Sequence, residues 1–169
     1  MLSRLAILLL IPMLLVACSQ ASVEVGESVK YNSPAPLLEG VTLTDEHVSS
    51  ASLGDGPVIL TFWATTCAPC RRELPMLEQL AKDYSDQNLT VLAINTGETS
   101  QEITDFLEEI SVDLPVVIDT DGTVMNRFEV LFLPTTYFID SNWVLRYRTI
   151  GEPRPSQIER GMEAVLANS

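Results

Sequence analysis

A pair of cysteines, Cys67 and Cys70, lies between a predicted apolar strand and a predicted helix, and this placement limits the folds that the chain can adopt. Residues 57–63 form a continuous apolar run of strand length, which is typical of a central strand covered on both faces. Leucines at helical spacing follow the pair and predict a helix over about residues 67–84. The Cys-Ala-Pro-Cys motif is therefore expected at the first turn of a helix that leaves a buried sheet.

This position favours thiol chemistry. The first N–H groups of a helix have no partner within the helix, and the helix dipole favours negative charge there. The thiolate is the form of cysteine that attacks a disulfide, and such surroundings lower the pKa of a cysteine. Cys70 lies one turn beyond Cys67 on the same helix face. We therefore expect Cys67 to be the nucleophile and Cys70 to be the thiol that resolves a mixed disulfide.

Three other interpretations of the pair stay open. A zinc site needs four ligands, and the chain has one histidine, His47, in a separate predicted turn. A structural disulfide of this spacing closes too short a loop to stabilise much. Two reduced cysteines buried in a core would not explain the position between strand and helix. A redox-active disulfide fits best, with no metal and no other cofactor.

The rest of the chain alternates between predicted strands and helices. A hairpin is expected over residues 37–43 and 48–53, and a helix over residues 100–110 with Ser100 as its cap. The other predicted elements are strands at 89–95 and 115–118, a short helix at 121–128, a hairpin at 135–140 and 143–149, and a closing helix at 155–166. This order predicts an α/β domain whose sheet has strands of mixed direction.

The N-terminus has the features of an export signal. Arg4 precedes an apolar stretch over residues 5–15 that is too short for a typical membrane span. The following Leu-Val-Ala-Cys resembles a bacterial lipobox, whose cysteine is lipidated and becomes the first residue after cleavage. We expect a signal peptide over residues 1–17, a lipid anchor on Cys18, a tether over residues 18–33 and a domain over residues 34–169. The alternative is an ordinary signal in which the cysteine is incidental.

The charge of the chain narrows the choice of partners. The formal net charge is −13. Nucleic-acid binding needs basic residues to neutralise phosphates, so no nucleic-acid partner is expected. Attachment to anionic lipid by charge alone is disfavoured for the same reason. We expect a monomer held at a membrane by its lipid.

The active-site segment resembles that of a known family. Residues 62–75 read Phe-Trp-Ala-Thr-Thr-Cys-Ala-Pro-Cys-Arg-Arg-Glu-Leu-Pro, which is similar to thioredoxin-like proteins and most of all to the TlpA/ResA group of envelope thiol–disulfide oxidoreductases. Residues 114–122, 133–140 and the helical insert around 97–110 resemble the same group. The resemblance covers about residues 34–167. It implies a thioredoxin-like fold with an N-terminal β-hairpin extension and a central helical insert.

The resemblance also implies a substrate-binding edge. Pro134 matches the cis-proline that packs beside the disulfide in this family, and it exposes the backbone of Leu133 for pairing with an extended peptide. Thr66 precedes the first cysteine, where many relatives have tryptophan, so the docking surface around Cys67 differs. Trp63 is expected in the core of the sheet rather than in catalysis.

Glu73 matches an acidic residue characteristic of the group. A partly buried carboxyl group one turn beyond Cys70 would have a raised pKa and could exchange a proton with that thiol. The alternative is a solvated glutamate paired with Arg71 or Arg72. Thioredoxins carry a buried acid on the strand before the motif, and this chain has Thr61 there, so proton transfer depends on Glu73 or on water.

The resemblance implies a reductive reaction. Reduced Cys67 would attack a disulfide in an exported protein, and a membrane-embedded thiol relay would supply electrons at the extracytoplasmic, or periplasmic, face. Apocytochrome c is a frequent substrate of such relatives. An oxidase or isomerase of the same fold and a non-catalytic binding lipoprotein are alternatives. So is a peroxiredoxin-like thiol peroxidase, although Ala64 stands where those enzymes need threonine or serine.

Overall fold

Five strands form the central sheet of the computed structural model, which describes residues 29–169. The strands are β3 (Val58–Trp63), β4 (Thr90–Thr96), β5 (Val116–Asp119), β6 (Thr135–Ile139) and β7 (Leu145–Ile150), in the order β5-β4-β3-β6-β7. β3, β4 and β5 run parallel, whereas β6 and β7 are antiparallel to their neighbours. The sheet is therefore mixed, as the sequence predicts.

β3 is the central strand because its side chains are apolar on both faces. All six of its residues are buried. Ile59 and Trp63 contribute to one hydrophobic cluster, and Leu60 and Phe62 contribute to another on the opposite face. Successive side chains of a strand point to opposite faces, so one apolar run supplies both halves of the core.

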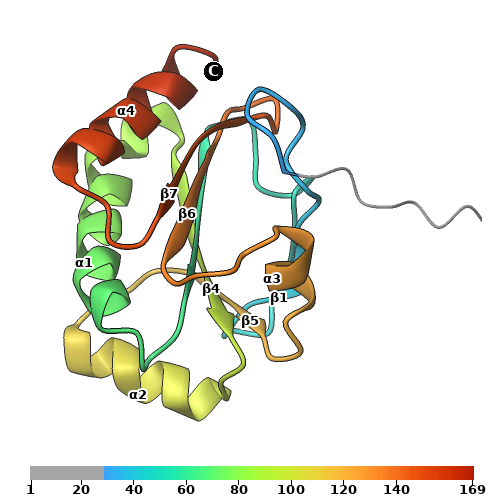
Figure 1. Cartoon of the computed structure of the whole chain (residues 1–169). Helices are drawn as coiled ribbons and strands as arrows, with labels where there is room; N and C mark the ends of the chain where they lie inside the picture. The colour runs from blue at the N-terminus through green and yellow to red at the C-terminus, as the bar shows by residue number, and fades with distance from the viewer. Residues whose placement is uncertain (1–28) are drawn as a thin grey trace, which may run out of the picture.

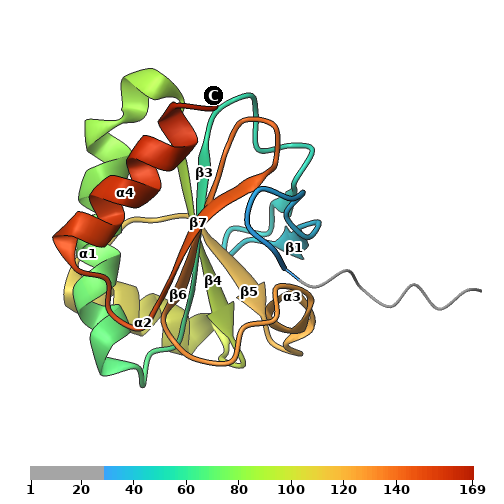
Figure 2. The same cartoon turned by 45° about the horizontal axis from the view of Figure 1, so that its top comes forward.

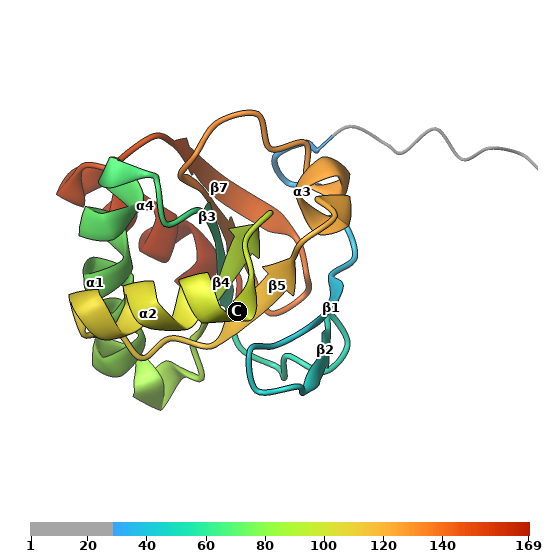
Figure 3. The same cartoon turned by 90° about the horizontal axis from the view of Figure 1, so that it is seen from below.

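The helices cover both faces of the sheet. Helices α1 (Ala68–Asp83), α2 (Ser100–Ile110) and α4 (Pro155–Leu166) lie on one face, and α3 (Thr123–Arg127) lies on the other (Figures 1 and 2). A short 3₁₀ helix, η1 (Ser85–Gln87), follows α1. The hairpin of β1 (Glu39–Val41) and β2 (His47–Ser49) lies beside β5, where Thr42 bridges to Val117 (Figure 3). This arrangement is the predicted thioredoxin-like fold.

Helix α2 has the predicted bounds but a different cap. Thr99 rather than Ser100 is the N-cap residue. The Thr99 N–H donates to the Glu102 carboxylate at 2.8 Å, and the Glu102 N–H donates to the Thr99 hydroxyl at 3.4 Å. A glutamate three residues after the cap completes such a capping box, which explains why Thr99 is selected.

The expected signal peptide, the lipid site Cys18 and most of the expected tether lie outside the described residues. The last residues of that tether belong to the fold, because the Asn32 N–H donates to the carbonyl oxygen of Leu145 at 2.8 Å. The Leu145 N–H donates in turn to the carbonyl oxygen of Ser33 at 3.0 Å. Within residues 29–169, none of the helices has the length and apolarity needed to cross a membrane.

Candidate active site

The two cysteines form a disulfide at the start of α1. Their sulfur atoms are 2.03 Å apart, and their Cα atoms are 5.3 Å apart. Cys67 is the N-cap residue, and its sulfur accepts a hydrogen bond from the Cys70 N–H at 3.3 Å. Cys67 is partly exposed, whereas Cys70 is fully buried. The helix start therefore presents one sulfur to solvent and keeps the other inside.

The Leu133–Pro134 peptide bond is cis, as the resemblance predicts. Pro134 is buried, and Leu133 is partly exposed and packs against the hydrophobic cores on both faces of the sheet. Cys67 packs against one of those two cores. Thr66 is exposed next to Cys67, so the solvent-facing surface of the site has a small polar residue there. Trp63 is fully buried in the sheet, as predicted.

Glu73 is a buried acid that points into the sheet. Its side chain is 1% exposed, and the Thr136 hydroxyl donates to Oε1 at 2.6 Å. Thr136 lies opposite Thr61 in the β3–β6 pair, and the two hydroxyl groups are 3.0 Å apart. Burial raises the pKa of Glu73 to about 7, while the hydrogen bond from Thr136 opposes the rise and the charge of Glu152 adds to it.

The alternative in which Glu73 pairs with a neighbouring arginine is wrong. Arg71 makes a bidentate ion pair with Glu109 on α2 at 2.9 and 3.1 Å. Arg72 pairs with Glu152, which follows β7, through contacts of 2.8 and 2.5 Å. Both arginines thus form ion pairs with acids outside α1, and the Glu73 carboxyl group is buried in the interior.

Sequence reasoning missed one polar group beside the motif. Glu98 follows β4 and accepts hydrogen bonds from Thr65, two residues before Cys67. A signal for it was present, because the chains that leave neighbouring parallel strands meet at the same sheet edge. An acid directly after β4 is therefore expected near the loop that follows β3.

The chain is similar to known proteins over most of its length. A family model described as the AhpC/TSA family matches residues 31–148. Thiol-disulfide oxidoreductase ResA of Geobacillus kaustophilus is 37% identical over 142 residues, which are 82% of this chain and 79% of that protein. ResA of Bacillus subtilis is 32% identical over 114 residues, which are 68% and 64% of the two chains.

A solved structure agrees with these relatives. The crystal structure of a thiol:disulfide interchange protein of the thioredoxin family from Chlorobium tepidum matches with a TM-score of 0.70 and 26% identity. It covers 81% of this chain and 98% of that one. Together with the Cys67–Cys70 disulfide at the start of a helix, these likenesses show that the chain belongs to the AhpC/TSA family and is a ResA-like thiol–disulfide oxidoreductase of the thioredoxin-like superfamily.

Proposed function

We propose that this oxidoreductase reduces disulfide bonds in exported proteins, with Cys67 as the attacking thiol and Cys70 as the resolving thiol. The observation that carries the proposal is the asymmetry of the pair, in which Cys67 is partly exposed and Cys70 is fully buried. A protein disulfide can reach only the outer sulfur. The inner sulfur, already within bonding distance, is in place to displace the partner.

The reaction needs two thiols and no metal or other cofactor. The Cys67 thiolate attacks one sulfur of the substrate disulfide, which forms a mixed disulfide and releases the other substrate sulfur as a thiolate. Cys70 loses its proton and attacks the Cys67 sulfur, which releases the second substrate thiolate and closes the Cys67–Cys70 bond. The substrate gains two electrons, and a dithiol donor must then reduce the protein again. We assign that step to a membrane-embedded thiol relay.

We assign to Glu73 the transfer of the proton to and from Cys70. The two residues are three positions apart on α1, and both side chains are buried. With a pKa of about 7, the Glu73 carboxyl group has both protonation states populated near neutral pH. It can accept the Cys70 proton as that thiol attacks and later return it.

The substrate and the location complete the proposal. The exposed Thr66 and the backbone of Leu133 would contact an extended substrate segment beside Cys67. Apocytochrome c is the substrate that the TlpA/ResA resemblance suggests. The lipobox-like sequence supports an anchor at Cys18, which would place the domain at the extracytoplasmic face of a membrane as a monomer.

Trapping tests the roles of the two cysteines. The Cys70→Ser variant should accumulate mixed disulfides between Cys67 and its substrates in cells, because the resolving thiol is absent. The matched variant Cys67→Ser should trap far fewer partners, since its remaining thiol is buried. Mass spectrometry of the trapped species identifies the substrates. Equal trapping by both variants would contradict the assigned roles.

The direction of electron flow is tested by equilibrium with glutathione. A reductase is expected to have a reduction potential of about −270 mV or lower, which favours the dithiol as electron donor. A value of about −120 mV is typical of a strong oxidant and would assign the protein to disulfide formation instead.

A further inference from the structure

One carboxylate outside the cysteine pair holds the loop that carries Cys67. The Thr65 N–H donates to both oxygens of Glu98, at 3.0 and 2.8 Å, and the Thr65 hydroxyl donates to Oε1 at 2.5 Å. The Asn95 amide donates to Oε2 at 2.6 Å. Glu98 therefore accepts four hydrogen bonds, and three of them come from the residue two positions before the nucleophile.

The sheet brings these groups together. β3 and β4 are parallel neighbours, with Trp63 opposite Asn95, so the chain leaves both strands at the same edge. After β4, Gly97 adopts a φ of 80°, a left-handed conformation that glycine adopts without strain, and Glu98 follows this turn. Asn95 is fully buried and supports the carboxylate from the β4 side.

We propose that Glu98 is a positioning residue for Cys67, because its carboxylate fixes Thr65 and so holds the loop between β3 and α1 in the geometry that attack on a disulfide requires. The inference rests on the proposed role of Cys67 as the nucleophile. Displacement at sulfur needs the attacking atom aligned with the bond that breaks, and small misplacements of a reacting group cost large factors in rate.

The contacts between Glu98 and Thr65 matter most in the reduced protein. In the oxidised form the bond to Cys70 itself ties Cys67 to α1. Reduction removes that bond. The loop then keeps its contacts with Glu98, the turn in which the Cys67 N–H donates to the carbonyl oxygen of Ala64 at 3.1 Å, and the bond from the Arg71 N–H to the carbonyl oxygen of Cys67 at 3.3 Å. The reduced form is the one that attacks the substrate.

Two substitutions weaken the hydrogen bonds between Glu98 and Thr65, and a third keeps them. Glu98→Gln keeps the shape of the side chain but replaces one acceptor oxygen with an amide that only donates, and both Thr65 and Asn95 present donors. Thr65→Val removes the hydroxyl and leaves the N–H contacts. Thr65→Ser keeps every contact and serves as the conservative variant.

Glu102→Gln is the matched control. The Glu102 carboxylate also accepts from the N–H and the hydroxyl of a threonine, Thr99, at 2.8 and 2.7 Å. The substitution removes the same charge and the same kind of contact, but from the capping box of α2 rather than from the Cys67 loop. A general effect of charge or of local stability would alter both variants alike.

The experiment follows the attack of the reduced full-length protein on a small aromatic disulfide. Cys67 releases the first aromatic thiolate as the mixed disulfide forms, and Cys70 releases the second as the intramolecular disulfide closes. The rate of the first release is measured against pH and taken on its pH-independent plateau, where differences in thiol ionisation no longer matter. Thermal unfolding of the oxidised variants reports whether the fold is retained.

We expect Glu98→Gln to lower the plateau rate by at least about ten-fold, and Thr65→Val to lower it by less. Thr65→Ser and Glu102→Gln should stay within about two-fold of the wild type. Equal plateau rates for Glu98→Gln and Glu102→Gln, whether unchanged or lowered together, would overturn the inference. A wild-type protein that releases no aromatic thiolate through Cys67 would instead refute the proposed function.

Discussion

At the scale of the residue, Glu73 should make the stability of the oxidised protein depend on pH. The pKa of this carboxyl group is about 7 in the fold, against a usual value of 4.5, chiefly because it is buried. The unfolded chain thus loses the proton near pH 4.5, whereas the folded protein keeps it until about pH 7. The free energy of unfolding should therefore fall as pH rises through this window, by up to about 3 kcal/mol.

The Glu73→Gln variant checks this prediction, because it lacks the titrating group. Urea unfolding at several pH values should show the variant gaining stability relative to the wild type between pH 4.5 and 7. The Thr136→Val variant removes a hydrogen bond that lowers the pKa of Glu73. The free energy of unfolding of this variant should therefore go on falling to a higher pH than in the wild type. Parallel pH profiles for Glu73→Gln and the wild type would show that the buried carboxyl group has no such effect.

The sequence predicts the positions of the two cysteines in the fold far better than it predicts the environment of Glu73. A strand, a Cys-Ala-Pro-Cys motif and a helix are local features, and they suffice to place Cys67 and Cys70. The spacing to Glu73 shows only that it follows one turn later. Its buried carboxyl group accepts a hydrogen bond from Thr136, which β6 places opposite Thr61 across a sequence separation of 75 residues. Such register cannot be inferred from local pattern.

At the scale of the element, α4 packs so closely on β6 that a glycine is required. A Cβ atom at Gly161 would lie 2.6 Å from the ring of Phe138. Replacing glycine by alanine inside a helix ordinarily stabilises by about 1 kcal/mol. Here the added methyl group must displace the ring, and overpacking of this kind costs about 1–3 kcal/mol. We expect Gly161→Ala to lower the free energy of unfolding by about 1 kcal/mol, as measured by urea unfolding.

A second substitution shows whether the ring is the cause. In a Phe138→Leu background the aromatic ring is absent, so Gly161→Ala should cost less than it does in the wild type. If Gly161→Ala lowers the free energy of unfolding equally in both backgrounds, the contact with the Phe138 ring is not the cause of the loss.

Elements with strong local signals follow the prediction most closely. α2 and α4 have the predicted bounds because apolar residues repeat at helical spacing, and α4 begins at Pro155, a residue suited to a first turn. The cap of α2 differs by one residue, since Thr99 and Glu102 form a capping box. Both strands of the first hairpin are shorter than predicted, β1 covering only Glu39–Val41. Apolar content alone does not show where pairing between strands stops.

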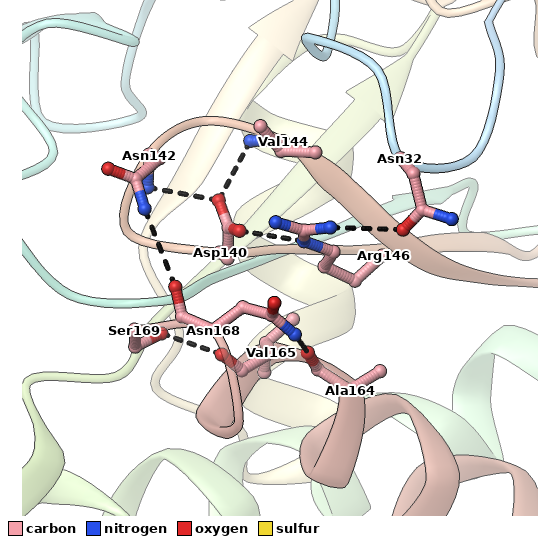
Figure 4. A network of polar contacts seen from close by, with 9 residues as sticks. All are labelled: Asn32, Asp140, Asn142, Val144, Arg146, Ala164, Val165, Asn168 and Ser169. Carbon is pink, nitrogen blue, oxygen red and sulfur yellow. Dashed lines mark hydrogen bonds and ion pairs between the residues drawn. The ribbon is translucent and has the colours of Figure 1, made fainter.

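At the scale of the whole molecule, a polar network joins parts of the chain that are far apart in sequence (Figure 4). Asp140, which follows β6, accepts hydrogen bonds from the N–H groups of Asn142 and Val144 and from Nε of Arg146. Arg146 also donates to the Asn32 side chain at 3.0 Å. The beginning of the described chain is thereby fastened to the β6–β7 hairpin.

This long-range link could not be predicted from the sequence. The layers of the fold follow from the alternation of apolar strands and amphipathic helices. The residues before Pro34 have few large apolar groups, so they resemble a tether. Their attachment includes backbone hydrogen bonds to Leu145 and the contact of Asn32 with an arginine 114 positions later. The same network continues to the C-terminal end, where the Asn142 side chain donates to the carbonyl oxygen of Asn168 at 3.4 Å.

The network should contribute more to stability than the surface ion pairs. The Asp140 side chain is fully buried, so Arg146→Gln leaves a buried carboxylate without its cation and should cost about 3–5 kcal/mol. Arg72→Gln is the matched control, because its pair with Glu152 is exposed and screened by solvent and should contribute little to stability. Urea unfolding measures both costs.

Amide exchange locates the effect of Arg146→Gln. The Asn32 N–H, which donates to Leu145, should exchange faster in this variant than in Arg72→Gln, even after the difference in global stability is taken into account. Equal costs and equal exchange in the two variants would mean that Arg146 does not hold the N-terminal segment. If the exchange at Asn32 rises as expected, Arg146 supports the backbone hydrogen bonds through which Asn32 and Ser33 join Leu145, and so helps to hold the start of the described chain at the edge of the sheet.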